Sequence, residues 1–435
     1  MPAATTTAAT AATAATAATA ATAIATTAAG TAGVIAAATA ADLPALRLKR
    51  HEERRLLSGH LWVFSNEVDI AQTPLNRFRP GELVRVLTHQ DRSLGVAYVN
   101  PHSLICARLL QSAELPTAQW FVARMKLALT LRQRLYDQPC YRWVYGESDA
   151  LPGLVIDRFG EDCVVQVATA GMQALLPQIL EALQAVAAPR RVLLKNDTAL
   201  RGLEGLPAQV EWARGEPGTA TVIENGLHYS ADLEQGQKTG WFYDQAANRR
   251  RLAAYIRPGA RVLDLFCYAG AWGINAARLG AAEVLCVDAS AQALAAASAN
   301  AKANDVTLRT RAGDAFETLE ALGQEGARFD LAVVDPPAFA KRKKDVPAAL
   351  AAYRRINQLA MRVLAPEGIL VSCSCSYHVG AEEFQGAIAK AARAADRQLQ
   401  ILEQGGQSAD HPVHPAIAET RYLKAFFCRV NDALS

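Results

Sequence analysis

The feature that most constrains the fold is a regular alternation of strand-like and helix-like segments from about Gly259 to the C-terminus. Strand-like runs cover residues 261–266, 283–288, 331–335 and 368–374, and helix-like runs cover 272–279, 292–303, 348–364 and 381–394. Strands separated by helices pair in parallel through crossovers, so a doubly wound, Rossmann-like α/β sheet is predicted. The last two strand-like runs, 398–403 and 422–430, lack a full helix between them, which predicts a terminal antiparallel pair.

Three further segments are expected ahead of this sheet. Residues 1–41 are an alanine and threonine tail with almost no large apolar side chain, and we expect it to be disordered. A transit peptide is the alternative, but such peptides are rich in arginine and this tail has none. Residues 42–113 contain short alternating stretches, such as 83–87 and 94–99, and predict a small β-rich domain. Residues 114–229 mix helix and strand patterns and predict a central α/β domain, which leaves 230–435 for the Rossmann-like domain.

The composition narrows the class of protein. The net charge is only +3, but basic residues cluster at 49–55, 249–251 and 341–344, where they form either solvated faces or an RNA-binding surface. The eight cysteines include no CxxC pair, so we expect free thiols and no metal site. We see no secretory signal and no apolar run long enough to span a bilayer, and we expect a cytoplasmic protein without a membrane partner.

A cofactor site is predicted where the first strands of the Rossmann-like domain end. The first strand ends in residues 264–273 (DLFCYAGAWG), which lack the G-x-G-x-x-G spacing of a dinucleotide site. Gly270 lets a ligand approach the backbone, and the Asp264 carboxylate repels phosphate but suits the cationic methionine end of S-adenosylmethionine. Asp288 follows the second strand and suits ribose hydroxyls, and Asp314 follows the third and suits an adenine amino group. The alternative is that these aspartates are ordinary helix caps.

A reaction site is predicted at the next two strand ends. Residues 335–339 (DPPAF) form a stiff loop of a kind typical of methyltransferases that act on nucleobases. Cys373 and Cys375 follow on the fifth strand and point the same way, and Cys375 lies nearer the loop. Carbon 5 of cytosine is a poor nucleophile until a thiolate adds to carbon 6, whereas nitrogen methylation needs no thiol. We therefore predict Cys375 as the nucleophile and Asp335 as the group that activates the ring at nitrogen 3.

From about Leu46 onward the chain resembles the bacterial large-subunit rRNA cytosine-5 methyltransferases, which have a PUA domain, a central α/β domain and a Rossmann-like domain in that order. The residues that carry the resemblance are 61–65 (LWVFS), 147–158 (ESDALPGLVIDR), 237–245 (QKTGWFYDQ) with Asn248 and Arg249, 335–339, 373–376 (CSCS) and 410–412 (DHP). The resemblance implies S-adenosylmethionine, large-subunit rRNA and a cysteine nucleophile at Cys375. This chain departs from the family pattern in two places. The alanine and threonine tail has no counterpart, and Pro337-Ala338 stands where other RNA cytosine-5 methyltransferases have Pro-Cys. The identity of the base that removes the carbon 5 proton therefore stays open.

The candidate residues fall into three groups. The catalytic candidates are Cys375 and Asp335. The cofactor candidates are Asp264, Phe266, Tyr268, Gly270, Asp288, Asp314, Tyr243 and Gln245. The substrate candidates are Pro336, Pro337, Phe339, Lys341, Arg249 and His411, and residues 238–240 are expected to form a lid over the cofactor.

Three other functions stay open at this stage. The same scaffold carries N-methyltransferases of guanine or adenine, for which Cys375 would be dispensable. A non-catalytic RNA-binding ribosome-assembly factor would bind no S-adenosylmethionine, and a small-molecule methyltransferase would bind no rRNA. The target nucleotide and the oligomeric state, monomer or homodimer, are also open.

Overall fold

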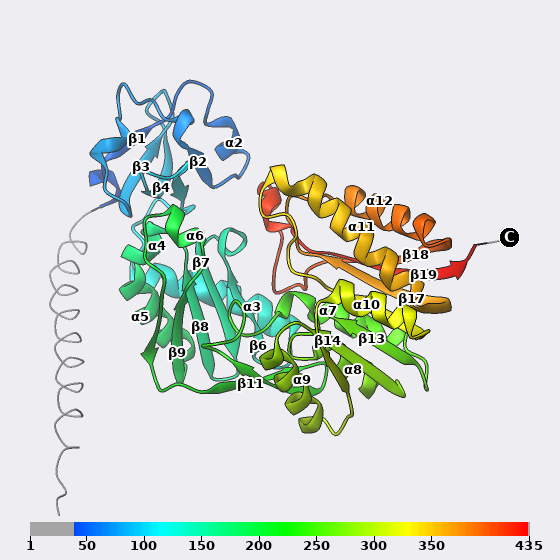
Figure 1. Ribbon diagram of the computed structural model, residues 1–435. Helices are drawn as coiled ribbons and strands as arrows, with labels where there is room; N and C mark the ends of the chain where they lie inside the picture. Colours follow the sequence, from blue (N-terminus) through cyan, green and yellow to red (C-terminus); the bar gives the residue numbers. More distant parts are fainter. Residues whose placement is uncertain (1–38, 434–435) are drawn as a thin grey trace, which may run out of the picture. The chain divides into compact units, whose positions relative to one another are not determined.

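The computed structural model describes residues 39–433, so the expected tail lies outside the described residues except for its last three. Two of those three belong to a 3-10 turn, Ala40–Asp42. The described chain divides into two compact units (Figure 1): residues 39–123, Thr169–Val186 and Leu203–Leu206, and residues 124–168, 187–202 and 207–433. Within 39–433, no helix has both the length and the apolar character that a bilayer crossing requires.

The first unit is built on a five-stranded sheet, which confirms the β-rich region expected there. The strand order is β1-β3-β4-β5-β2, and β1 pairs with β3 in parallel while the other neighbours are antiparallel. Alternate side chains such as Val84 and Val86 are fully buried, as the period of two predicts. The elements are β1 (Ala45–Arg47), α2 (Arg54–Leu57), β2 (Trp62–Phe64), β3 (Glu82–Leu87), β4 (Ser93–Val99), β5 (Ile105–Leu109), α4 (Ala170–Ala174) and most of α5 (Leu176–Ala187).

The helical segment of residues 170–187 is divided into two helices. Helix α4 ends at Ala174 and α5 begins at Leu176. Pro177 lies in the first turn of α5, where its missing N–H is tolerated, but it cannot continue a helix from the residues before it.

The second unit contains a five-stranded sheet, a hairpin and a seven-stranded sheet. The five-stranded sheet has the order β10-β9-β8-β7-β6, in which β8 and β9 are parallel and the other neighbours are antiparallel. Its elements and those of the hairpin are α3 (Ala118–Leu135), β6 (Cys140–Tyr145), β7 (Leu154–Phe159), β8 (Asp162–Val167), β9 (Arg191–Asn196), α6 (Leu200–Leu203), β10 (Gln209–Arg214), β11 (Thr219–Glu224) and β12 (Leu227–Asp232).

The seven-stranded sheet confirms the doubly wound fold. Its order is β15-β14-β13-β16-β17-β19-β18, with parallel pairing from β15 to β17 and antiparallel pairing of β19 with both β17 and β18. Its elements are α7 (Ala246–Arg251), β13 (Arg261–Leu265), α8 (Ala271–Arg278), β14 (Glu283–Asp288), α9 (Ala291–Ala303), β15 (Arg309–Ala312), α10 (Ala315–Gln324), β16 (Phe329–Val334), α11 (Val346–Arg362), β17 (Leu364–Ser374), α12 (Ala381–Ala394), β18 (Arg397–Gly405) and β19 (Lys424–Asp432).

Each face of this sheet has its own apolar core because successive side chains on a strand point to opposite faces. Leu263 and Leu265 of β13 pack into a cluster with α10, α11 and α12. Val262 of the same strand packs into a second cluster with Trp272 of α8 and Leu294 of α9. Because β13 to β17 run parallel to one another, their carboxyl ends lie at one edge of the sheet, where ligands bind in such folds.

Candidate active site

A cavity of about 570 Å³ opens at the carboxyl edge of the seven-stranded sheet. The strand-end loops that line it follow β13, β14, β15, β16 and β17, and further walls come from the segment before and in α7 and from the residues before β19. Its size lies within the range of small-molecule sites, about 300–1,000 Å³. The cavity therefore brings together both catalytic candidates and five of the eight cofactor candidates, which are Phe266, Tyr268, Asp288, Asp314 and Gln245.

Two predicted carboxylates, Asp288 and Asp314, line the part of the cavity at the ends of β14 and β15, which we call the cofactor half. Asp288, at the end of β14, accepts hydrogen bonds from the backbone N–H groups of Tyr268 (2.9 Å) and Ser290 (2.9 Å). Asp314 caps α10 by accepting from the N–H groups of Phe316 and Glu317 through a single oxygen, Oδ1. Asp314 is therefore a helix cap, as the alternative interpretation stated. The residue also lines the cavity, and its Oδ2 takes no part in the capping bonds.

The loop after β13 has a left-handed backbone. Phe266 has φ +60° and Tyr268 has φ +46°, and both side chains line the cavity. Gly270 has φ +79° and precedes α8, and a Cβ on it would lie 2.9 Å from the Cβ of Ala297. Gly270 is thus required for the turn and for packing against α9, while Phe266 and Tyr268 present the rings.

Asp264 has a different position from the one predicted. Strand β13 continues through Leu265, so Asp264 lies inside the strand, is fully buried and is not among the cavity-lining residues. Its carboxylate accepts a hydrogen bond from the Gly273 N–H in α8 (2.9 Å). Burial raises the pKa of Asp264 to about 8. The carboxylate thus anchors α8 and does not line the cavity, so direct contact with a methionine moiety is not supported.

Asp335 directly follows β16, in the part of the cavity next to β16 and β17, which we call the reaction half. Two side chains donate hydrogen bonds to its carboxylate. The Gln245 amide donates to its Oδ1 (2.8 Å), and the Trp272 indole N–H donates to its Oδ2 (3.0 Å). Removal from water raises the pKa of Asp335 to about 6, although the bond from Trp272 opposes the rise. Asp335 therefore exchanges a proton near neutral pH, which suits a group that shares a proton with a ring nitrogen.

Cys375 lines the same cavity beside Asp335. Its thiol is 3.9 Å from the carbonyl oxygen of Pro336, and the side chain is half-buried. Cys373 is fully buried in the apolar cluster under α8, so the geometry separates the two candidate cysteines. Burial raises the pKa of the Cys375 thiol to about 11, while the positive charges of Lys238 and Lys424 lower it.

Lys424, which the sequence interpretation did not single out, is a buried cation next to this thiol. Its Nζ donates to the carbonyl oxygens of Ser376 (2.7 Å) and Tyr422 (2.9 Å), and it is 6% exposed. Burial lowers the pKa of Lys424 to about 8, and the neighbouring Cys375 raises it. No sequence motif marks this lysine, because it follows an irregular segment and its place depends on the pairing of β17 with β19.

The segment around residues 237–249 forms one wall of the cavity. Gln245 and Arg249 line it as predicted, but Arg249 is also paired with Glu224 at 2.5 Å and is 3% exposed. Tyr243 does not line the cavity; its hydroxyl donates to the Arg158 carbonyl and its ring is buried, so direct cofactor contact is not supported.

Asp244 belongs to the same quoted motif but was not predicted as a site residue. It lines the cavity and is 4% exposed. The Tyr422 hydroxyl donates to its Oδ2 at 2.5 Å. The sequence did indicate this segment, because Asp244 lies between the candidates Tyr243 and Gln245. Adjacency in sequence does not show, however, which of three neighbouring residues faces a ligand.

The predicted substrate residues divide in the same way. Pro336 and Pro337 line the cavity. Phe339 instead packs its ring 4.8 Å from that of Tyr353, against the core. Lys341 is exposed beyond the loop, and His411 is 2% exposed, and neither is among the cavity-lining residues.

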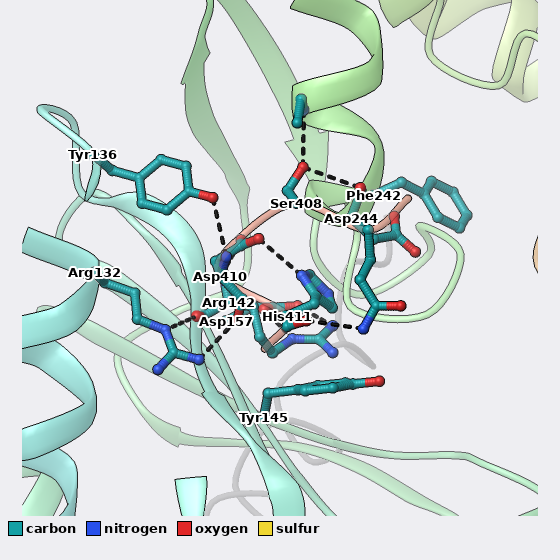
Figure 2. A network of polar contacts seen from close by, with 12 residues as sticks. Arg132, Tyr136, Arg142, Tyr145, Asp157, Phe242, Asp244, Ser408, Asp410 and His411 are labelled. Carbon is teal, nitrogen blue, oxygen red and sulfur yellow. Dashed lines mark hydrogen bonds and ion pairs between the residues drawn. The ribbon is translucent and has the colours of Figure 1, made fainter. Parts of the chain in front are cut away.

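His411 belongs to a buried polar network that braces the cavity wall (Figure 2). Its ring Nδ1 pairs with the Asp410 carboxylate (2.9 Å), which also accepts from the Arg142 backbone N–H (2.8 Å). The Asp410 carbonyl accepts from Arg132 (2.8 Å). Direct contact between His411 and a substrate is therefore not supported; it fixes the loop that carries Ser408 against the Asp244 backbone.

Comparison with known proteins gives matches over almost the whole described chain. A family model described as S-adenosylmethionine-dependent methyltransferase matches residues 171–429, and a PUA-like domain model matches residues 46–112. The Ribosomal RNA large subunit methyltransferase I of Photobacterium profundum is 36% identical over 396 residues, 89% of this chain and 99% of the relative. The Ribosomal RNA large subunit methyltransferase of Deinococcus radiodurans is 36% identical over 414 residues, 91% of this chain and 100% of the relative.

Solved structures show the same fold. A methyltransferase structure in complex with SAH superposes with a TM-score of 0.76 at 21% identity, covering 89% of this chain and 100% of that one. A SAM-dependent methyltransferase from Streptococcus mutans gives a TM-score of 0.74 at 20% identity. At this level of identity the likeness concerns the fold.

Proposed function

The chain belongs to the S-adenosylmethionine-dependent methyltransferase family, and from this premise we propose that it methylates carbon 5 of a cytosine in large-subunit ribosomal RNA through a bond between Cys375 and carbon 6. The observation that carries the proposal is that the Cys375 thiol and the Asp335 carboxylate share one cavity, while Cys373 is buried in the core. The choice of rRNA rests on the relatives, which are named for the large subunit and match over nearly their full length.

The cavity residues fit the cofactor of this family. S-adenosylmethionine supplies a methyl group that is electrophilic because it is carried on a sulfonium. The Asp288 and Asp314 carboxylates would accept from its hydroxyl and amino groups, and the ring of Phe266 offers an apolar wall. The acidic lining disfavours a phosphate-bearing dinucleotide in the same place.

The protein groups around the base would act in a defined order. Cys375 attacks carbon 6 as a thiolate, which the charges of Lys238 and Lys424 favour against the effect of burial. Asp335 donates a hydrogen bond to nitrogen 3 in its protonated form, so that electron density from the new C–S bond reaches carbon 5. Gln245 and Trp272 fix Asp335 for this task, and Pro336 and Pro337 stiffen the loop beneath the base.

The test compares Cys375, which directly follows β17, with Cys373, which lies inside that strand. Cys375→Ala and the matched control Cys373→Ala are incubated with labelled S-adenosylmethionine and large-subunit rRNA lacking the modification, and the nucleosides are analysed by mass spectrometry. We expect 5-methylcytidine from the wild type and from Cys373→Ala, and none from Cys375→Ala. Continued methyl transfer by Cys375→Ala, with methylguanosine or methyladenosine as product, contradicts the thiol chemistry and favours an N-methyltransferase. A wild type that gains no thermal stability from S-adenosylhomocysteine favours a non-catalytic factor instead.

A further inference from the structure

Asp244 carries a buried carboxylate oxygen that has no partner among the described residues. The side chain lines the cavity and is 4% exposed. Its Oδ2 accepts from the Tyr422 hydroxyl, but its Oδ1 is buried and accepts no hydrogen bond within residues 39–433. An unpaired buried acceptor costs about 1–3 kcal/mol, so such atoms are rare and call for an explanation. Because the Asp244 side chain lines the cavity, a ligand bound there is the candidate partner of this oxygen.

The backbone of Asp244 is fixed from the opposite side. The N–H and the hydroxyl of Ser408 both donate to the Asp244 carbonyl, at 2.9 and 3.0 Å (Figure 2). The Ser408 hydroxyl also accepts from the Ala247 N–H (2.8 Å). Asp244 and Gln245 lie in the short 3-10 turn Tyr243–Gln245, which directly precedes α7. The Asp244 residue is therefore held at the cavity wall by a rigid backbone.

The surroundings keep this carboxylate ionised. Burial by itself would raise the pKa of Asp244, but the charges of Lys238, His411 and Arg142 and the hydrogen bond from Tyr422 lower it below its ordinary value overall. Asp335 is the neighbouring acid, and its own pKa is raised to about 6 by burial and, in part, by the charge of Asp244. The cavity thus holds two carboxyl groups whose affinities for a proton differ.

The two carboxyl groups also differ in what their oxygens already do. Both oxygens of Asp335 accept from protein donors, Gln245 and Trp272. Asp244 keeps Oδ1 free, and its charge acts on Cys375 and on Asp335, so it lies in the reaction half of the cavity. A base that takes a proton from carbon needs an ionised oxygen with a free lone pair near the nucleophile. Asp244 meets this requirement, whereas Asp335 has a pKa raised to about 6 and is already used in its protonated form at nitrogen 3 in the proposed mechanism.

We propose that Asp244 is the base that removes the carbon 5 proton after methyl transfer, an inference that rests on the proposed cytosine chemistry. In this step the C5–H bond breaks and its proton passes to Oδ1 of Asp244. The electron pair of that bond forms the C5=C6 double bond, and the C6–S bond breaks with its pair remaining on the Cys375 thiolate. Asp244 then releases the proton to water when the product leaves, which returns both groups to their starting state.

The experiment separates methyl transfer from proton removal with two labels. The substrate RNA carries tritium on carbon 5 of its cytosines, and S-adenosylmethionine carries a ¹⁴C methyl group. The variants are Asp244→Asn, which keeps the shape of the side chain, and the matched control Asp137→Asn, an exposed aspartate outside the cavity. We expect Asp244→Asn to transfer ¹⁴C to RNA that stays bonded to the protein on a denaturing gel. Tritium release should fall at least about 100-fold, the lower range for loss of a general base.

Each other result has a meaning. Tritium release by Asp244→Asn at the wild-type rate overturns the proposal. So does a folded Asp244→Asn that forms no labelled adduct, or one whose affinity for S-adenosylhomocysteine falls tenfold, since Asp244 then serves binding. A wild type that releases no tritium refutes the cytosine chemistry itself, independently of Asp244. The double variant Asp244→Asn/Cys375→Ala must form no adduct.

A second variant tests the same idea through a positioning residue. Tyr422→Phe removes the hydroxyl that donates to Asp244, so the pKa of Asp244 rises. Because proton removal needs the ionised carboxylate, the acid limb of tritium release moves to higher pH. A purely structural role of Tyr422 would lower the rate at every pH and leave the limb in place, which would contradict the proposal.

Discussion

The ion pair between Arg249 and Glu224 allows the sharpest test of how the cavity wall is held. Glu224 ends β11 and binds Arg249 of α7 through two hydrogen bonds of 2.5 and 2.6 Å, and it also accepts from the Trp241 indole (3.0 Å). The side chains are 7% and 3% exposed. Glu224→Gln leaves the guanidinium charged and buried with a neutral partner. Breaking a buried pair costs about 3–5 kcal/mol. Because Gln keeps one acceptor and Arg249 keeps its bond to the Phe242 carbonyl, we expect the lower end, about 3 kcal/mol.

The assay is urea unfolding followed by circular dichroism, with Glu325→Gln as the matched control. Glu325 makes the same kind of pair with Arg311 at 3.1 Å, but these side chains are 53% and 35% exposed. An exposed pair contributes about 0–1 kcal/mol, so the control should change the free energy of unfolding by less than 1 kcal/mol. The reasoning is refuted if the two variants lose equal stability.

Three further predictions concern charge. Lys238→Met removes a charge that lowers the pKa of Cys375, so alkylation of this thiol should need higher pH; the other free cysteines are buried, so iodoacetamide reports on Cys375. Burial raises the pKa of Asp264 to about 8, so the folded state binds its proton more tightly than the unfolded chain does, and the free energy of unfolding falls as the pH rises from about 4 to 8. Asp264→Asn should reduce this fall, as unfolding measured across the same pH range would show. Lys341→Glu/Lys343→Glu, at two exposed positions, should weaken binding to single-stranded rRNA and flatten its salt dependence by about 0.7 per lost phosphate contact, as gel shifts at several salt concentrations would show.

The order of strands and helices in the second half of the chain was predictable because period and length report directly on packing. The same periodicity is weaker at a strand's end, and this is where Asp264 was misplaced. The strand was predicted over residues 261–266 with Asp264 facing the cofactor, whereas in β13 (Arg261–Leu265) Asp264 lies inside the strand. Leu265 packs under α10–α12 and Asp264 points to the other face, toward Gly273 of α8. Neighbouring residues of a strand point to opposite faces of the sheet, so a carboxylate inside the strand can face a helix and not the ligand edge.

The direction of side chains in irregular segments was not predictable at all. Tyr243, Asp244 and Gln245 are consecutive, yet Tyr243 is buried against the Arg158 carbonyl while the other two face the cavity. The choice is made by partners far away in sequence, such as Tyr422 for Asp244. A motif therefore identifies the segment, and only tertiary contacts identify the residue.

The buried network beside the cavity has a physical cost that favours a functional interpretation. Arg142 pairs with Asp157 at 2.6 Å, and Asp157 accepts from Thr239 in the cavity-wall segment at 2.5 Å. Burying such pairs rarely stabilises a fold more than apolar side chains of similar size would. Here the charge of Arg142 has a second effect, since it helps to lower the pKa of Asp244. The same arginine therefore holds the wall, through Asp157, and biases the carboxylate on it toward the ionised form. A wall of purely apolar side chains could also hold its shape, but it would not keep Asp244 ionised, because burial alone would raise the pKa of this carboxyl group.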